Sequence, residues 1–389
     1  MASDRAFFDW NATAPLRREA RVAMTGALAL TGNPSSVHAE GRVARRLVEE
    51  AREKVASLAG AEAKNVTFTS SATEANMLAL TPVIQADGRK FLRDKLFVSA
   101  IEHPSVRSGG RFPPNNVQEL PVIAEGVVDL HALRGAVGQV EHPLVSVMLA
   151  NNETGVVQPI AAIAEIVHAA NGLLHVDAVQ GPGRIDCRIG ELGADLMSLS
   201  AHKMGGPQGA GALICRGEIH IADPLLKGGS QERGLRAGTE NVAAIAGFGA
   251  AAAVAETAWQ AEAHRMAGLR DRIEAGLKAT APDLVIFGDG AGRLPNTSLF
   301  TVPGLKAETA IIAFDLKGIA VSSGSACSSG KVQSSPVLAA MGVDPALGRG
   351  AVRVSLGWST TETEIEMLLN GWNEVVSSLF KGRKQGMAA

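Results

Sequence analysis

The stretch Leu196-Met-Ser-Leu-Ser-Ala-His-Lys203-Met-Gly-Gly-Pro-Gln-Gly-Ala-Gly211 places a lysine between a short apolar run and a glycine-rich turn. The apolar run predicts a buried strand, and a second one (212–215) follows the turn. A buried ammonium is costly unless it is paired or neutralised. Lys203 is therefore either a strand-end lysine that reaches solvent or the amine of a Schiff base to an aldehyde cofactor, pyridoxal phosphate. This stretch alone leaves both interpretations open.

Composition narrows the class of protein. A chain of 389 residues can form two domains, and its net charge of −2 indicates neither nucleic acid nor an anionic membrane as a partner. The N-terminus lacks the pattern of a signal peptide, and the alanine-rich run 243–255 is typical of a packed core helix. Three cysteines, Cys187, Cys215 and Cys327, are too few for a disulfide framework. We expect a soluble cytoplasmic protein.

Buried strands alternate with helices along the first two thirds of the chain. The predicted strands are 66–69, 96–99, 144–149, 173–177 and 196–200. This alternation favours an α/β fold with a mostly parallel sheet. Ligands of such sheets bind beyond the carboxyl ends of the strands, where the polar residues of this chain gather.

A second unit is expected beyond residue 258, where the composition changes. A long polar helix (259–278) precedes strands at 284–287, 297–302 and 319–322 and helices at 307–316 and 361–379. We predict a large cofactor-binding domain, residues 15–258. Residues 1–14 and 259–389 would form a smaller α/β domain that carries a mobile cysteine loop at about 322–336.

Pyridoxal phosphate needs an acid beside its pyridine nitrogen and a cup for its phosphate. Asp177 ends an apolar strand and is the candidate acid, although an aspartate there, taken alone, is more often a helix N-cap. Gln180 could donate to the phenolic oxygen. The candidate phosphate ligands lie at a helix N-terminus or beside the lysine, and they are Ala72, Thr73, Ser200 and His202. The helix start at Ser71 also fits a plain capping box.

Three further side chains are candidates for contacts with cofactor or substrate. His103 follows a buried strand and could stack on the ring and move protons, although a lone histidine there is more often structural. The amide of Asn152 could reach the phenolic oxygen or a substrate carboxylate. Arg353 offers a bidentate fork for that carboxylate. No metal site is predicted.

Cys327 differs from the other two cysteines in its surroundings. Seven of the sixteen residues from Val321 to Pro336 are serine, so this segment cannot bury much apolar surface. Cys187 and Cys215 sit beside strand residues and are interpreted as small core hydrophobes. A thiol on a mobile loop is a poor structural choice but suits a nucleophile that must travel.

Seven motifs together resemble the cysteine desulfurases, class V enzymes of pyridoxal-phosphate fold type I. They cover nearly the whole chain in order: Ser-Ala-Thr-Glu-Ala-Asn (71–76), Glu-His-Pro-Ser (102–105), Asn-Asn-Glu-Thr-Gly (151–155), His-Val-Asp-Ala-Val-Gln (175–180), Ser-Ala-His-Lys (200–203), Arg-Ala-Gly-Thr-Glu-Asn (236–241) and Ser-Ser-Gly-Ser-Ala-Cys (322–327). The last motif resembles the nitrogen-fixation and housekeeping iron–sulfur group.

The resemblance implies a fold, an activity and roles for individual residues. It implies a large domain with a mostly parallel mixed sheet and a homodimer that converts L-cysteine to L-alanine. The sulfur would pass as a persulfide on Cys327 to a protein acceptor, an iron–sulfur scaffold or sulfur carrier. Lys203 would hold the cofactor, His103 would stack on its ring, and Thr239 would reach the phosphate of the other subunit.

The chain departs from the family pattern at three places. Trp358 stands where an arginine is usual, the segment after Cys327 differs, and the C-terminus is short. A class V aminotransferase or a selenocysteine lyase on the same fold is the alternative enzyme, and it would not need Cys327. A non-catalytic sulfur-carrier partner with a vestigial cofactor site is the alternative from another class. Intact Lys203, Asp177 and His103 argue against it.

Overall fold

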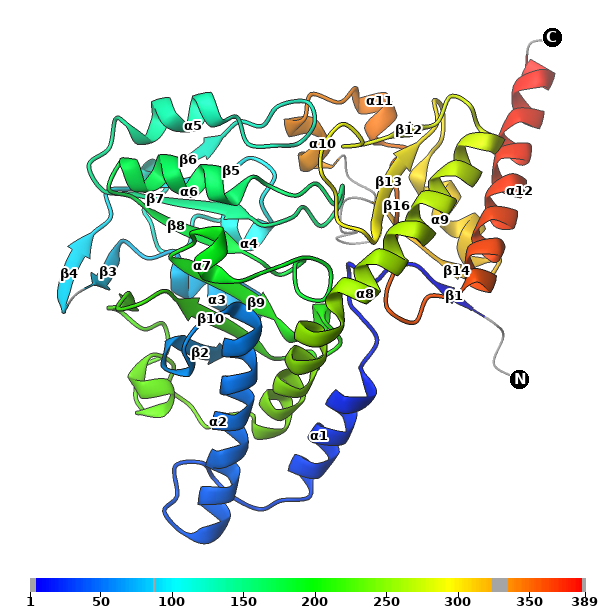
Figure 1. Ribbon diagram of the computed structural model, residues 1–389. Coiled ribbons are helices and arrows are strands. Elements are labelled where there is room, and N and C mark those ends of the chain that lie inside the picture. Colours follow the sequence, from blue (N-terminus) through cyan, green and yellow to red (C-terminus); the bar gives the residue numbers. More distant parts are fainter. Residues whose placement is uncertain (1–4, 87, 324–334, 387–389) are drawn as a thin grey trace.

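A seven-stranded mixed sheet forms the centre of the computed structural model, which describes residues 5–86, 88–323 and 335–386 (Figure 1). Its strand order is β2-β10-β9-β8-β7-β5-β6. Only β10 runs antiparallel to its neighbours. The strands are β2 (Val66–Thr69), β5 (Lys95–Ser99), β6 (Val117–Leu120), β7 (Pro143–Met148), β8 (Leu173–Asp177), β9 (Leu196–Ser200) and β10 (Gly211–Cys215). The predicted α/β fold with a mostly parallel sheet is confirmed.

Helices cover both faces of this sheet, so successive strand residues alternate between two cores. Phe97 packs into the core that includes α2, α6 and α8, whereas Leu96 and Val98 pack into the core that includes α3 and α4. The helices of this part are α1 (Arg18–Leu28), α2 (Ala39–Ala59), α3 (Ala72–Ala79), α4 (Pro104–Arg107), α5 (Leu130–Val137), α6 (Ile160–Ala169) and α7 (Ile189–Leu192). Burial on both faces explains the continuous apolar runs of the strands.

A second, four-stranded sheet has the order β12-β13-β16-β15 and its own apolar core. Its strands are β12 (Val285–Ile286), β13 (Thr297–Thr301), β15 (Ser322–Ser323) and β16 (Val352–Ser355). A short parallel pair joins β1 (Ala6–Phe7) to β14 (Ile319–Ala320), so the first strand of the chain lies with its last third. The helices here are α9 (Ala307–Asp315), α10 (Pro336–Ala340), α11 (Pro345–Gly348) and α12 (Glu362–Gly386).

One helix, α8 (Val242–Thr280), connects the two parts (Figure 1). The sequence suggested an apolar helix and a separate polar one, but the change of composition at residue 258 marks a change of surroundings within a single helix. The expected domain boundary there stays a prediction. By length and composition α8 could cross a membrane, yet half of its most apolar window is buried, and its apolar half packs against α1 and α2.

Some elements were not expected from the sequence. They form a small antiparallel sheet of β3 (Val83–Ala86), β4 (Arg89–Leu92) and β11 (His220–Ile221). Four short 3₁₀ segments complete the described structure: η1 (Ala63–Asn65), η2 (Pro114–Asn116), η3 (Ala201–Lys203) and η4 (Gln231–Gly234).

A buried ion pair fastens η4 to α2. Arg52 donates to both carboxylate oxygens of Glu232, at 2.6 and 2.8 Å, and to the carbonyl of Val66 at 2.9 Å. Glu232 also accepts from the amide of Phe68 at 2.9 Å, and its φ of 46° lies in the left-handed region. The contacts of Arg52 therefore compensate both a buried charge and an unfavourable backbone conformation.

Replacing Arg52 by Met should lower the free energy of unfolding by about 3–5 kcal/mol, because Glu232 keeps a buried charge without a partner. Urea titration followed by circular dichroism measures the change. Arg46→Met on the same helix is the control, since its side chain is 67% exposed and its ion pair with Glu50 should contribute less than about 0.5 kcal/mol. Equal losses for the two variants would contradict a special role for Arg52.

Candidate active site

Lys203 lies directly after β9, in η3, and its ammonium is bound by main-chain carbonyls rather than by a carboxylate. Its Nζ donates to the oxygens of Asn11 and Ala12, at 2.5 and 2.8 Å. Burial, together with the charges of Arg353 and Arg184, lowers the pKa of Lys203 to about 7, and the charges of Asp9 and Asp177 oppose this shift. A substantial fraction of the amine is thus neutral, and able to act as a nucleophile, near pH 7.

Residues 9–17 run across η3 as a strap and are tied to it at several points. The amide of Ala14 donates to the carbonyl of His202 at 2.9 Å, and that of Arg17 donates to Gly205 at 2.8 Å. His202 Nδ1 lies 3.1 Å from the hydroxyl of Thr13. Burial, with the charge of Lys203, lowers the pKa of His202 to about 4, so its ring is neutral.

Asn11 lies in the strap and was not identified as a candidate from the sequence. Its side chain is 1% exposed and donates to Asn152 O at 3.1 Å and to Thr297 Oγ1 at 2.9 Å. Its amide donates to Ser355 Oγ at 3.0 Å. Because Thr297 and Ser355 lie on β13 and β16, Asn11 connects the second sheet to the lysine.

Asp177 ends β8 and is almost fully buried. Its Oδ2 accepts from Asn76 Nδ2 at 2.9 Å, and its Oδ1 accepts from the amide of Val179 at 3.1 Å. No ion pair to Asp177 occurs among the described residues. A buried carboxylate with neutral donors only is costly, so it suits a cationic partner from outside the chain.

His103 is linked to Asp177 through neighbouring side chains. Ser105 Oγ accepts from Asn76 at 2.9 Å and lies 2.8 Å from His103 Nδ1. The amide of Ser105 donates to the same Nδ1 at 3.2 Å, so a neutral His103 carries its proton on Nε2. Partial desolvation lowers the pKa of His103, Asp177 opposes this, and the charge of Lys203 adds to it.

Glu102, beside His103, was not expected to matter. Its Oε1 accepts from Ser99 Oγ at 2.6 Å and from the amide of Met148 at 2.7 Å, while its Oε2 is buried without a partner. Burial, opposed by the Ser99 hydrogen bond and reinforced by the charge of Asp177, raises the pKa of Glu102 to about 8. Glu102 is therefore mostly neutral at pH 7 and adds little negative charge beside Asp177.

The predicted phosphate ligands meet where α3 approaches the sheet. Ala72 and Thr73 are the first residues of α3, so their amides have no intrahelical acceptor. Gly211 pairs with Ser200 in the sheet. A Cβ on Gly211 would lie 2.8 Å from the amide nitrogen of Ala72, so only glycine admits this close approach. The four candidates Ala72, Thr73, Ser200 and His202 thus come from neighbouring segments.

Arg353 lies on β16 and reaches the loop after β7. Its Nη1 donates to the carbonyl of Asn152 at 2.9 Å, and its Nη2 donates to Asp9 at 2.6 Å. Its Nε is buried and has no acceptor among the residues that the structure describes. Only part of the donor capacity of this guanidinium is used, which fits an anionic ligand.

Gln180 follows β8 and lies between Asn11 and a second arginine. Its Nε2 donates to the carbonyl of Asn11 at 3.1 Å, and its Oε1 accepts from Arg184. Burial and the charge of Arg353 lower the pKa of Arg184 to about 10. No motif pointed to Arg184, although a charged residue shortly after a buried strand is a usable signal.

Thr239 is exposed in the loop that precedes α8. The same loop is fixed near the start of α3, because Arg236 pairs with Glu74 at 3.0 Å. Cys187 and Cys215 are both buried, as the sequence suggested, and burial raises the pKa of each thiol. Cys327 lies outside the described residues.

Trp358, the residue that departs from the family pattern, packs against the strap. Its ring lies edge-on to Trp10, with centroids 4.7 Å apart, and the guanidinium carbon of Arg17 lies 3.7 Å from its centroid. Arg17 donates to Glu262 of α8 at 2.7 Å and to the carbonyl of Met204 at 3.1 Å. A tryptophan here therefore holds an arginine against the turn that follows Lys203.

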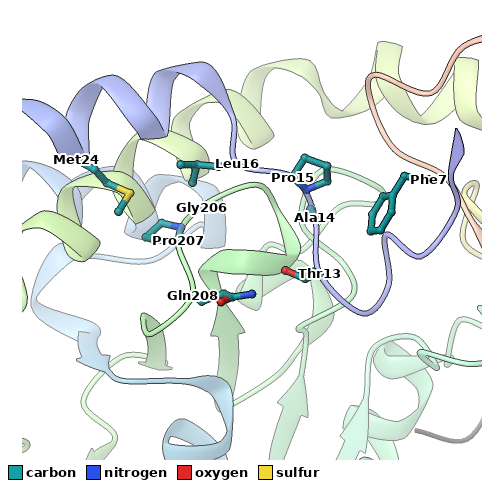
Figure 2. Close-up of a pocket in the computed structure, with 9 residues that line it drawn as sticks. All are labelled: Phe7, Thr13, Ala14, Pro15, Leu16, Met24, Gly206, Pro207 and Gln208. Atoms are coloured by element: carbon teal, nitrogen blue, oxygen red, sulfur yellow. The ribbon is translucent and has the colours of Figure 1, made fainter. Parts of the chain in front are cut away.

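A pocket of about 510 Å³ opens beside the same strap (Figure 2). It is lined mainly by small and apolar residues, namely Phe7, Thr13, Ala14, Pro15, Leu16, Met24, Gly206, Pro207 and Gln208. None of the candidate catalytic side chains lines it. This pocket is thus a neighbour of the lysine site and not the site itself.

The residues present fit pyridoxal phosphate. Asp177 pairs with no cation in the part of the chain that the structure describes, the start of α3 offers free amides beside Gly211, and Lys203 supplies a partly neutral amine. These three features match the pyridine nitrogen, the phosphate and the aldehyde of this cofactor.

Comparison with known proteins gives the family. The aminotransferase class-V family profile matches residues 6–368. A cysteine desulfurase of Cereibacter sphaeroides is 40% identical over 97% of this chain and 97% of its own length. The cysteine desulfurase IscS of Dictyoglomus turgidum is 39% identical over 96% of this chain and 95% of its own.

A solved structure agrees with this assignment. The NifS-like protein from Rickettsia africae superimposes with a TM-score of 0.87 at 36% identity and covers 96% of this chain and 99% of its own. The chain belongs to the cysteine desulfurases of the class-V aminotransferase family, which depends on pyridoxal phosphate.

Proposed function

We propose that this protein is a sulfurtransferase that converts L-cysteine to L-alanine and passes the sulfur to a protein acceptor as a persulfide on Cys327. The observation that carries the proposal is the meeting of Lys203, Asp177 and Arg353 at one edge of the central sheet. Lys203 supplies an amine, Asp177 an unpaired carboxylate, and Arg353 a fork for a carboxylate ligand.

The cofactor ligands are proposed residue by residue. Lys203 binds the aldehyde, Asp177 pairs with the pyridine nitrogen, and Gln180 and Asn152 lie near the phenolic oxygen. Ala72, Thr73, Ser200 and His202 hold the phosphate, with Thr239 of a second copy. When bound, pyridoxal phosphate serves as an electron sink that stabilises negative charge on the substrate carbons.

Lys203 and His103 are proposed to move the protons. The amine of Lys203, whose pKa is lowered to about 7, could accept a proton from the substrate whenever it is not bound to the cofactor. His103 Nε2 carries a proton in the neutral ring, so it can donate without an earlier charging step. Glu102, close to Asp177, is mostly neutral at pH 7 and so adds little negative charge there.

Cys327 is proposed to accept the sulfur. Its thiolate attacks the sulfur of L-cysteine, a sulfur–sulfur bond forms, and the carbon–sulfur bond breaks with its electron pair left on carbon. A proton then completes alanine, so no external oxidant or reductant is needed. The described residues on either side of Cys327 support this role because they contact the proposed site. Ser322 pairs with Arg353 in the sheet, and Ser335 donates to Glu153, the neighbour of Asn152, at 2.6 Å.

Further parts of the proposal concern assembly and location. Large apolar side chains are exposed on α1 and the loop after it, at Val22, Leu28, Leu30 and Val37. We propose that a second copy of the chain packs on this face. We also propose a cytoplasmic enzyme, divided into a cofactor domain (15–258) and a smaller domain (1–14 and 259–389), whose acceptor serves iron–sulfur or related assembly.

Replacing Lys203 by Ala should abolish the covalent link to the cofactor and lower kcat by about 10²–10⁴-fold, because both the nucleophile and a proton carrier are lost. Borohydride reduction followed by peptide mass spectrometry measures the link. Lys64→Ala is the control, because Lys64 is half-exposed and pairs only with Glu62 and Glu218. A cofactor adduct that persists on another lysine would contradict the role of Lys203.

Replacing Cys327 by Ala should leave the visible cofactor band unchanged and abolish alanine formation, because the sulfur then has no acceptor. Alanine is quantified after incubation with L-cysteine, and mass spectrometry of the wild type should find one additional sulfur on Cys327. Cys215→Ala, a buried cysteine, is the control that should keep activity. Full desulfuration by Cys327→Ala would refute the assignment.

Replacing Arg353 by Lys should raise KM for L-cysteine by about 10–100-fold with a smaller change in kcat, because the charge stays but the fork is lost. Steady-state kinetics separates the two constants. Arg349→Lys is the control, since Arg349 is exposed. If KM stays at the wild-type value while the melting temperature falls, Arg353 is structural only.

A further inference from the structure

Arg184 is a buried arginine that has no acidic partner among the described residues. Its side chain is 5% exposed, and both of its hydrogen bonds go to Gln180, to the main-chain oxygen at 2.9 Å and to Oε1. Burying a guanidinium without a carboxylate partner costs free energy, which suggests that Arg184 has a function that outweighs this cost. Nothing in the proposed mechanism uses it.

The two neighbours of Gln180 determine which way its amide faces. Arg184 can only donate, so the atom that faces it must be the oxygen Oε1. The carbonyl of Asn11 can only accept, so the atom that faces it must be the nitrogen Nε2. A flipped amide would set a donor against a donor and an acceptor against an acceptor.

The same carbonyl connects this amide to the lysine. Asn11 O accepts from Gln180 Nε2 at 3.1 Å and from Lys203 Nζ at 2.5 Å, which uses both of its lone pairs. The donors and acceptors of the hydrogen bonds that link Arg184 to Lys203 can therefore be arranged in only one way. Nε2 of Gln180 keeps a second hydrogen that is not used by Asn11.

We propose that Arg184 is a positioning residue that orients the Gln180 amide so that it offers an N–H donor to the cofactor next to Lys203. This inference rests on the proposed function, because it requires pyridoxal phosphate to bind at Lys203. Arg184 acts through Gln180, without contact with the substrate. The positive charge of Arg184 also lowers the pKa of Lys203, although burial and the charge of Arg353 contribute more.

A double-mutant cycle on the affinity for pyridoxal phosphate tests the inference. The cofactor-free protein is titrated with pyridoxal phosphate, which gives Kd without turnover. We expect Arg184→Met and Gln180→Met each to weaken binding by about tenfold, and the double variant to weaken it no further, because neighbours that act as one unit are not additive. Arg184→Lys, which keeps a donor, should recover most of the affinity.

Arg188→Met is the matched control, because Arg188 lies on the same segment but is exposed and pairs with Asp186. Its Kd should equal that of the wild type. A hundredfold loss in the double variant, or an unchanged Kd for Arg184→Met, overturns the inference. If Arg184→Met does not fold, Arg184→Lys is tested instead, both alone and combined with Gln180→Met. The small loss of affinity caused by Arg184→Lys should disappear in the Gln180→Met background. A loss that persists there overturns the inference.

Failure of the proposed function gives a different result. A wild-type protein that binds no pyridoxal phosphate would refute the proposed function itself. A wild type that binds the cofactor, together with an Arg184→Met variant of equal affinity, refutes only the role of Arg184.

Discussion

The active site depends on how a lysine is kept at the buried end of a strand. A carboxylate partner would stabilise the ammonium and make the amine a poor nucleophile. The chain instead supplies two carbonyl oxygens, from Asn11 and Ala12, at 2.5 and 2.8 Å. Carbonyls satisfy the donors of Lys203 without adding a full negative charge, so burial can still lower its pKa to about 7. The segment that supplies them must then be held in place by other contacts.

The need to hold the strap in place explains the polar contacts of Asn11 and Arg17 and the packing of Trp358 on Arg17. Asn11 is bound on every polar atom and ties the strap to the second sheet. Arg17 ties its far end to α8 through Glu262 and is covered by Trp358. The second sheet thus contributes more than Arg353 to the site, because it holds the carbonyls that hold the lysine.

The sequence predicted the fold well where one physical signal dominated. The strands at 66–69 and 173–177 coincide with β2 and β8, because β-branched and apolar residues dominate both segments and nearly all of their residues are buried. The small sheet of β3, β4 and β11 was missed, since its strands are short and partly exposed. The two helices expected on either side of residue 258 form the single helix α8, because a helix can change from buried to exposed surroundings without a change of backbone.

Site residues were predictable when the chemistry of the cofactor demanded their type, as for Lys203 and Asp177. Their roles stay predictions, as does that of Cys327. Asn11, Glu102 and Arg184 were not found, because each is an ordinary polar residue until its neighbours are known. Glu102 becomes informative only through its unpaired Oε2, and Arg184 only through the absence of a carboxylate among the described residues.

The balance of charge around Lys203 connects these observations. Arg184 and Arg353 are positive and nearby, Asp9 pairs with Arg353, and Asp177 has no cation of its own. Glu102 removes its negative charge by staying mostly protonated. The surroundings are thus prepared for an anionic ligand near the arginines and a cationic ring beside Asp177. A cofactor that brings a phosphate and a protonated pyridine, with a substrate that brings a carboxylate, compensates the charges that the chain itself leaves unpaired.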